Sequence, residues 1–201
     1  MSVAIVKYNA GNIFSVENAL KRIGQEAVVT DNPDVIRAAD KVIFPGVGEA
    51  GTTMQYLREH GLDTLIRSLR QPTLGICIGL QLLCAYSEEG DTECLGVFDE
   101  RVSRFEAGKQ KIPHIGWNTI QAKSSQAKSS PLFAGLGSDP YVYYVHSYCA
   151  QLGAHTIATT HYGQPFSAAL HRDNFYALQF HPEKSAQVGE QILKNFLQIA
   201  S

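Results

Sequence analysis

A cysteine between two glycines is the residue of this sequence best suited to covalent chemistry. Cys77 stands in Gly75-Ile76-Cys77-Ile78-Gly79, between an apolar run at 72–76 that predicts a buried strand and a helical pattern at 80–86. A sharp strand-to-helix turn exposes such a nucleophile, and the glycines remove side chains that would clash there. Because a helix starts at the turn, its free N–H groups and positive dipole end favour thiolate over thiol. The segment predicts a nucleophilic cysteine, with an ordinary packed cysteine as the alternative.

A histidine and a carboxylate two residues apart follow another predicted strand. His181-Pro182-Glu183 comes directly after the run at 175–180, and α/β sheets place their ligands at the carboxyl ends of strands. Residues two apart in an extended chain face the same side, and Pro182 favours an extended conformation at His181. His181 can therefore face the sulfur while Glu183 reaches the far ring nitrogen and stabilises the imidazolium. We expect Cys77, His181 and Glu183 to form a catalytic triad.

A loop with two glycines could complete the chemistry. Pro45-Gly46-Val47-Gly48 follows the predicted strand at 41–44. Attack of a cysteine on an amide carbon places negative charge on oxygen, which needs hydrogen-bond donors at short range. We expect an oxyanion hole built from the backbone at Val47, Gly48 and Ile78, although a plain glycine turn would have the same sequence.

These segments need a fold that brings the ends of several strands together. Strand and helix patterns alternate through the first half of the chain and predict an α/β fold with a mostly parallel central sheet and helices on both faces. The expected strands are 3–6, 27–30, 41–44 and 72–76, and the expected helices are 13–23, ending at Gly24, 35–39, 53–59 and 62–69.

The rest of the chain has a different pattern. Short β-rich runs at 97–105, 117–120, 141–148 and 155–160 predict a smaller antiparallel section. After the strand at 175–180, a final helix at 185–199 places Val188, Ile192, Phe196 and Ile199 on one face. The sequence QAKSS at 121–125 is repeated at 126–130, and so polar a stretch predicts a solvated loop.

Composition narrows the class of protein. With 201 residues, of which 44% are apolar, we expect a single domain over residues 1–201. A net charge of −2 gives no electrostatic reason to bind nucleic acid or an anionic membrane. The N-terminus lacks a signal-peptide layout, and no apolar run reaches the length of a membrane span. The four cysteines lack the spacing of a zinc site or a disulfide framework, so we expect a cytoplasmic protein without metal or cofactor.

The cysteine turn, the Pro45–Gly48 loop and the His-Pro-Glu segment together resemble the class I, triad-type glutamine amidotransferases. More narrowly, the chain is similar over essentially its whole length to the glutaminase subunits of imidazole glycerol phosphate synthase. The narrower resemblance lies in the segments at 8–12, 113–118, 145–148 and 181–184. One departure is Lys7-Tyr8-Asn9, where that family usually has Asp-Tyr-Gly before its Gly-Asn pair.

The resemblance implies hydrolysis of glutamine to glutamate and ammonia through a thioester on Cys77. It implies a glutamine pocket with Glu89 near the substrate α-amino group, and the pocket residues would be Gly46, Gln81, Glu89, His146, Ser147 and Tyr148. The ammonia would pass to a barrel-shaped cyclase subunit in a heterodimer. That subunit makes imidazole glycerol phosphate and an aminoimidazole carboxamide ribotide in histidine biosynthesis. The contact residues implied for it are Asn12, Trp117, Tyr143 and Lys184.

Several other interpretations fit the motifs. The chain could serve another ammonia acceptor, such as the vitamin B6, anthranilate, carbamoyl phosphate or guanylate synthases. It could instead be a cysteine peptidase or γ-glutamyl hydrolase that works without a partner, or a non-catalytic binding module. For individual residues, Glu89 could be a solvated turn residue, Trp117 could be a core residue, and His146 and Tyr148 could simply pack within a strand.

Overall fold

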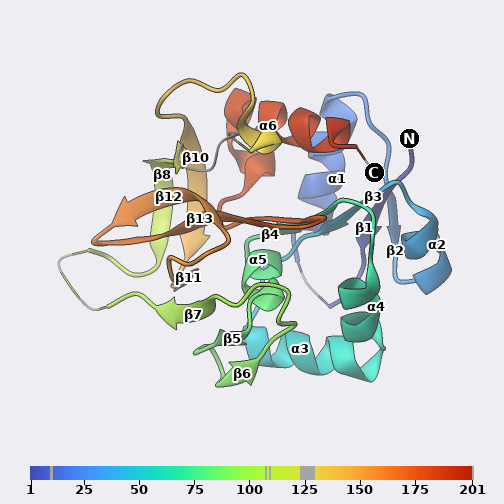
Figure 1. The fold of residues 1–201 in the computed structure, drawn as a ribbon, viewed down its shortest axis with the longest axis horizontal. Helices are drawn as coiled ribbons and strands as arrows, with labels where there is room; N and C mark the ends of the chain where they lie inside the picture. Colours follow the sequence, from blue (N-terminus) through green and yellow to red (C-terminus); the bar gives the residue numbers. More distant parts are fainter. Residues whose placement is uncertain (10, 107, 109, 123–129, 201) are drawn as a thin grey trace.

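An eight-stranded sheet runs through the centre of the molecule (Figure 1). The computed structural model describes residues 1–9, 11–106, 108, 110–122 and 130–200. The strand order is β2-β1-β3-β4-β14-β13-β12-β9. The first five strands are parallel, and the last three continue the sheet in antiparallel fashion. In this order the strands are Val28–Thr30, Val3–Val6, Lys41–Phe44, Thr73–Ile76, Phe175–Leu178, Gln164–Arg172, Thr156–Tyr162 and Gln121–Ala122.

Helices cover both faces of this sheet, as the alternating pattern predicts. In Figure 1, α1 and α6 lie above the strands, whereas α3 and α5 lie below them. The helices are α1 (Ile13–Arg22), α2 (Pro33–Ala38), α3 (Ala50–Glu59), α4 (Leu62–Ser68), α5 (Ile78–Leu83) and α6 (Ala186–Gln198). Along β1, Val3 and Ile5 pack with α1 and α6, while Ala4 and Val6 pack with the helices of the other face. Successive strand residues point to opposite faces, so one short strand contributes to two cores.

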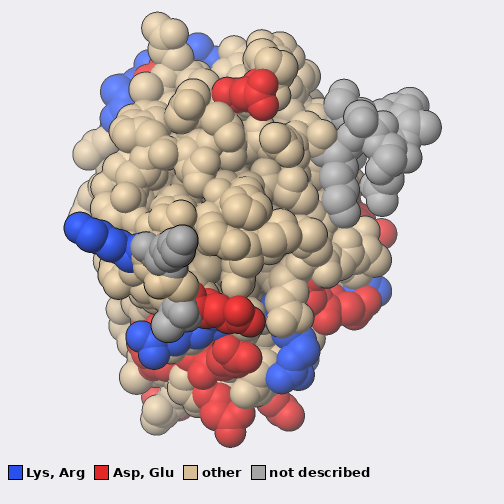
Figure 2. Space-filling model, turned by 90° about the vertical axis from the view of Figure 1, so that its left-hand side faces the viewer, with Lys and Arg blue, Asp and Glu red and all other residues tan. Residues whose placement is uncertain are grey.

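Two smaller sheets lie beside the main one. A two-stranded antiparallel ribbon pairs β8 (His114–Thr119) with β10 (Tyr141–His146). The other sheet has the order β11-β7-β5-β6, and its strands are Tyr148–Ala150, Arg101–Arg104, Tyr86–Ser87 and Thr92–Glu93. Among the described residues there are also two short 3₁₀ helices, η1 (Pro131–Phe133) and η2 (Pro182–Lys184). Figure 2 looks at the side of the molecule where β8, β10 and β12 lie, and the middle of that side is largely free of charged side chains.

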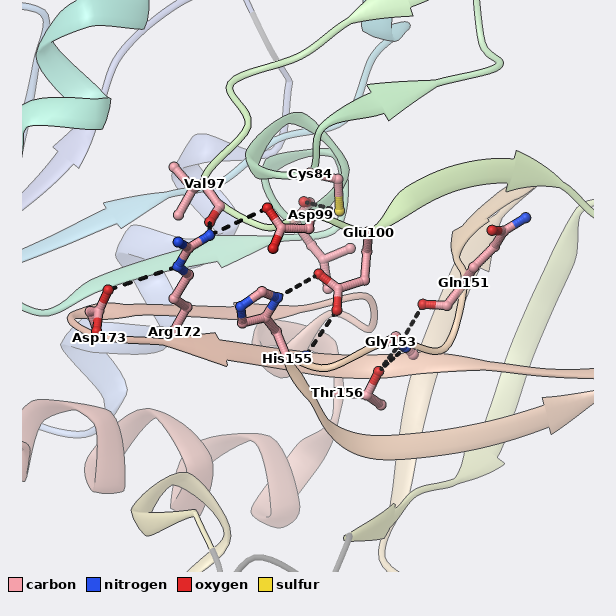
Figure 3. Close-up of polar contacts among 12 residues, drawn as sticks. Cys84, Val97, Asp99, Glu100, Gln151, Gly153, His155, Thr156, Arg172 and Asp173 are labelled. Atoms are coloured by element: carbon pink, nitrogen blue, oxygen red, sulfur yellow. Dashed lines mark hydrogen bonds and ion pairs between the residues drawn. The ribbon is translucent and has the colours of Figure 1, made fainter.

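A buried carboxylate joins the loop before β12 to the segment before β7 (Figure 3). Glu100 accepts hydrogen bonds from the backbone N–H of His155 at 2.9 Å and from its Nδ1 at 3.0 Å. A Cβ on Gly153 would lie 2.4 Å from a carboxylate oxygen of Glu100, so only glycine fits beside it. This contact fixes a connection that no local sequence pattern specifies.

Most predicted elements are present, with shifted ends. Helix α1 ends as predicted: Gly24 has a φ of +79°, and the N–H groups of Gly24 and Gln25 bond the carbonyls of Lys21 and Leu20. The helix predicted to reach 86 stops at Leu83, because the backbone is extended from Cys84 onward.

Other differences concern the strands of the second half. Strand β13 was not predicted, because Pro165 and a run of small residues have weak strand preference, yet its middle is buried. The strand predicted at 97–105 is confined to Arg101–Arg104. Of the QAKSS repeat, Gln121–Ala122 form β9, and residues 123–129 lie outside the described residues. No helix within the described ranges is long and apolar enough to cross a bilayer.

The packing of α5 against β3 gives a stability prediction. A Cβ on Gly79 would lie 2.1 Å from the carbonyl oxygen of Phe44. Because this oxygen belongs to the backbone of β3, it cannot easily move to relieve the clash. We therefore expect Gly79→Ala to lower the free energy of unfolding by about 1–3 kcal/mol, despite the higher helix preference of alanine. Urea unfolding measures the change.

The matched control for this substitution is Gly137→Ala. Gly137 is exposed, and a Cβ there would meet nothing within 4 Å. Its variant should unfold within about 0.5 kcal/mol of the parent protein. Equal stability of the two variants would contradict the packing argument.

Candidate active site

Cys77 occupies a strained position at the end of β4. Its φ of 55° and ψ of −107° lie where residues other than glycine are rarely found. The sheet holds it there, since the N–H of Cys77 bonds the carbonyl of Leu178 at 2.8 Å. A Cβ on Gly75 would lie 2.7 Å from Leu83 and one on Gly79 would strike Phe44, so both glycines are needed for the close approach of α5. The sharp turn predicted at this cysteine is present.

The His-Pro-Glu segment lies at the end of the neighbouring strand. Strand β14 is parallel to β4 and pairs Leu178 with Ile76, so the two strands end side by side. His181 has an extended backbone, with φ −99° and ψ 97°, and its Nδ1 lies 2.8 Å from Oε1 of Glu183. Both side chains are fully buried. Asn12, at the start of α1, donates a short hydrogen bond to the same Glu183 oxygen, so a third residue fixes the carboxylate.

The imidazole of His181 is set up to carry a positive charge. Burial alone lowers the pKa of His181, but the nearby Cys77 and the hydrogen-bonded Glu183 outweigh this effect and raise the pKa to about 10. Within the described residues Nε2 of His181 has no hydrogen-bond partner. The thiol of Cys77 is thus near enough to influence the ring without being hydrogen-bonded to it, and catalytic contacts are often loose before substrate binds.

Cys77 opens onto a cavity of about 300 Å³. The cavity brings together the sulfur, the expected oxyanion residues and five of the six expected pocket residues. Its lining comprises Val47, Gly48, Cys77, Ile78, Gln81, Glu89, Pro113, Val145, His146, Ser147 and Tyr148. Gly46 is not among them, and it packs against Tyr8, since a Cβ there would be 2.0 Å from the Tyr8 hydroxyl. Pro113 and Val145 were not expected from the sequence.

The loop that carries Val47 is held by the segment before α1. The hydroxyl of Tyr8 donates to the carbonyl of Pro45, and a Cβ on Gly11 would lie 2.9 Å from the Val47 side chain. Burial and the nearby Cys77 raise the pKa of Tyr8, so it stays a hydrogen-bond donor. Lys7 and Asn9, which depart from the family pattern, are exposed, whereas Tyr8 between them is buried.

Glu89 is a half-buried carboxylate at the cavity. Its Oε2 accepts the backbone N–H of Ala50 at 2.9 Å, and no cationic side chain of the described residues forms an ion pair with it. Burial raises the pKa of Glu89, the bond from Ala50 lowers it, and the charge of Glu49 raises it again, with a net rise. Such a carboxylate favours a cation as its ligand.

The expected partner residues lie near the His181–Glu183 pair. Trp117 is exposed and meets Tyr143 edge to face at 5.9 Å, because the two are paired across β8 and β10. The carbonyl of Tyr143 accepts the N–H of His181 at 2.9 Å. Lys184 is exposed, next to the triad carboxylate. Asn12 is only half-buried, and its contact with Glu183 was not foreseen, since 171 positions separate the two residues.

Comparison with known proteins places the chain in a family. Residues 5–200 match the model of the class-I glutamine amidotransferases. The imidazole glycerol phosphate synthase subunit HisH of Bacteroides fragilis (strain ATCC 25285) is 59% identical over 201 residues, covering 99% of this chain and 100% of the relative. This chain belongs to the HisH group of class-I glutamine amidotransferases.

Other relatives agree. HisH of Bacteroides thetaiotaomicron is 56% identical over 201 residues, again covering 99% of this chain and 100% of the relative. A crystal structure described as a glutamine amidotransferase aligns with a TM-score of 0.74 at 22% identity, covering 98% of both chains. That structural likeness confirms the predicted fold: a mostly parallel central sheet with smaller antiparallel sheets beside it.

The raised pKa of His181 predicts a pH-dependent signal. Since the pKa rises from 6.5 to about 10, the ring should keep both protons at pH 7–8 and lose one only at higher pH. Cys77→Ala and Glu183→Gln should each lower the pKa, because each removes a group that favours the charged ring. NMR titration of the ¹⁵N-labelled imidazole measures this.

The second buried histidine of the site provides an internal comparison. Burial lowers the pKa of His146 to about 3, so that ring should stay neutral through the same titration. A parent His181 that releases its proton near pH 6.5 would show that Cys77 and Glu183 do not act on it.

Proposed function

We propose that this protein hydrolyses glutamine through a thioester on Cys77 and delivers the ammonia to a cyclase subunit. The observation that carries the proposal is the placement of Cys77 on a cavity wall beside a buried His181–Glu183 pair. Membership of the HisH group supports both the glutaminase reaction and its place in histidine biosynthesis.

The reaction uses each member of the triad in turn. The Cys77 thiolate attacks the carbon of the glutamine side-chain amide, and the C–N bond breaks as protonated His181 gives its proton to the leaving ammonia. Water then attacks the thioester while His181 takes a proton from it, and glutamate leaves as the C–S bond breaks. Glu183 holds the ring through Nδ1 and stabilises its charge, and Asn12 holds Glu183.

The rest of the cavity orients the substrate. Glu89 would bind the α-ammonium group, because it is the cavity's carboxylate and lacks a cationic partner among the described residues. Backbone N–H groups of Val47, Gly48 and Ile78 would stabilise the oxygen that becomes negative on attack. Gln81, His146, Ser147 and Tyr148 form the remaining wall. Gly46 would act indirectly, by letting Tyr8 pack under the loop.

The outer face of the β8–β10 ribbon would receive the cyclase subunit in a heterodimer. Ile115, Trp117 and Tyr141 are 59%, 52% and 58% exposed, and such large apolar side chains rarely gather on a surface without a partner. The alternate residues Val142 and Tyr144 are buried, so only one face of the ribbon is free. Three expected contact residues connect this face to the triad. The carbonyl of Tyr143 accepts the N–H of His181, Asn12 donates to Glu183, and Lys184 follows Glu183 in the chain.

Two further parts of the proposal concern the chain as a whole. A cytoplasmic location is supported by the four free cysteines, which suit a reducing compartment. A single domain over residues 1–201 is supported by the way both core clusters share the strands of one sheet.

A coupled assay tests this function. The protein, the cyclase subunit, glutamine and the nucleotide substrate should together yield imidazole glycerol phosphate. Cys77→Ala should abolish glutamine-dependent product, while added ammonium salt should still support it, because the cyclase needs only ammonia. Cys94→Ala, at a half-buried cysteine that does not line the cavity, should remain active. If the Cys77→Ala variant still formed imidazole glycerol phosphate from glutamine, the proposed thioester on Cys77 would be refuted.

The docking face gives a separate prediction. Tryptophan at an interface centre typically contributes about 2 kcal/mol or more, so Trp117→Ala should weaken cyclase binding by roughly thirtyfold. Isothermal titration of the two subunits measures the affinity. Val35→Ala on α2, on the opposite side of the molecule in Figure 1, is the control and should bind like the parent. Equal affinities would place the cyclase elsewhere.

A further inference from the structure

We propose that His114, which does not line the cavity, is a positioning residue for the glutamine pocket. Its imidazole holds His146 in one tautomer and orientation, and through His146 it holds the Tyr148 carbonyl and Gln81. The inference rests on the proposed function, since it assigns His114 to the same pocket.

The hydrogen bonds determine which nitrogen carries each proton. Nδ1 of His146 lies 2.8 Å from the carbonyl oxygen of Tyr148. A carbonyl only accepts, so Nδ1 of His146 must donate. Nε2 of His146 lies 3.1 Å from Nδ1 of His114. In a neutral His146 this Nε2 is an acceptor, and Nδ1 of His114 is therefore its donor.

The surroundings keep both rings neutral. His114 is 3% exposed and His146 is 6% exposed. Burial lowers the pKa of His114 to about 4. Burial also lowers the pKa of His146 to about 3; the bond to the Tyr148 carbonyl opposes this shift, and the charges of His114 and His181 add to it. A neutral His146 also avoids placing a second cation near the charged His181. The donor from His114 is thus the remaining way to satisfy Nε2 of His146.

Aromatic side chains fix the orientation of the His114 ring. It is stacked between Tyr162, at a centroid distance of 3.9 Å and 17° between planes, and Tyr144, at 4.8 Å and 21°. Both tyrosines are themselves tied, because the Tyr144 hydroxyl bonds Thr160 at 2.7 Å and the Tyr162 hydroxyl donates to the carbonyl of Lys111 at 2.7 Å. Stacking fixes the plane of the His114 ring, and the contact of Nδ1 with Nε2 of His146 at 3.1 Å selects which edge of the ring faces His146.

The effect of this donor extends to the cavity wall. The Tyr148 carbonyl accepts from His146 and also from Nε2 of Gln81 at 2.9 Å, and that amide reaches Oε1 of Gln179 at 3.2 Å. Gln81, His146 and Tyr148 all line the cavity. Without the His114 donor, Nε2 of His146 becomes a buried acceptor with no partner, and the ring gains by turning away from Tyr148.

The test compares two substitutions of His114 in the presence of the cyclase subunit. His114→Phe keeps an aromatic ring between the tyrosines but removes the donor, and His114→Asn keeps an N–H donor near the place of Nδ1. We expect His114→Phe to raise the KM for glutamine about three- to tenfold with kcat changed less than about twofold. His114→Asn should restore the KM, which a purely structural role for the ring would not explain.

The tautomer of His146 is read separately, from ¹⁵N NMR of the ring. His114→Phe should change which nitrogen of His146 is protonated, and His114→Asn should preserve it. The control is His171→Phe, because His171 also stacks on a tyrosine, Tyr176, at 4.2 Å, but lies at the opposite end of the strands from Cys77.

The outcomes separate this inference from the proposed function. An unchanged His146 tautomer in His114→Phe would overturn the positioning role. A changed tautomer together with an unchanged KM would overturn the placement of glutamine against His146, which belongs to the proposed function. A raised KM in both His114→Phe and His114→Asn would also overturn the inference, since the donor would then be irrelevant.

Discussion

The whole site depends on the close approach of α5 to the ends of β3 and β4. Gly79 lies against the carbonyl of Phe44, and Gly75 lies against Leu83, so the helix starts immediately after the strand. This contact leaves Cys77 in a positive-φ conformation that a relaxed chain would abandon. The hydrophobic cores on both faces of the sheet supply the free energy that keeps it there.

Parallel pairing of the strands then determines which residues lie beside Cys77. Because β14 lies next to β4 in register, the segment after β14 emerges beside the segment after β4. The residues after β14 are His181 and Glu183, and the segment after β3 is the loop containing Val47. Three consecutive strands of one sheet thereby bring the residues proposed as nucleophile, base and oxyanion loop to one edge, where open α/β sheets commonly place their ligand sites.

Local patterns were sufficient for the parts of the structure that are local. The strand and helix alternation, the turn at Cys77, the end of α1 at Gly24 and the apolar face of α6 all follow from neighbouring residues. Contacts between distant residues could not be predicted in this way. The bond from Asn12 to Glu183 and the pairing of His114 with His146 depend on which elements become neighbours. Strand β13 could not be predicted from its residues, because their intrinsic strand preference is weak. The segment is a strand because its middle is buried in the sheet.

The β8–β10 ribbon has a consequence for communication between subunits. Tyr141 and Tyr143, on the outer side of β10, alternate with Val142, Tyr144 and His146 on the inner side, and His146 lines the cavity, so the surface and the inner wall belong to the two sides of a single backbone. A protein seated on the outer side would press on peptide groups that also carry the inner side chains. Coupling between a bound subunit and the cavity therefore needs to cross only one strand, and it does not require a long chain of intervening residues.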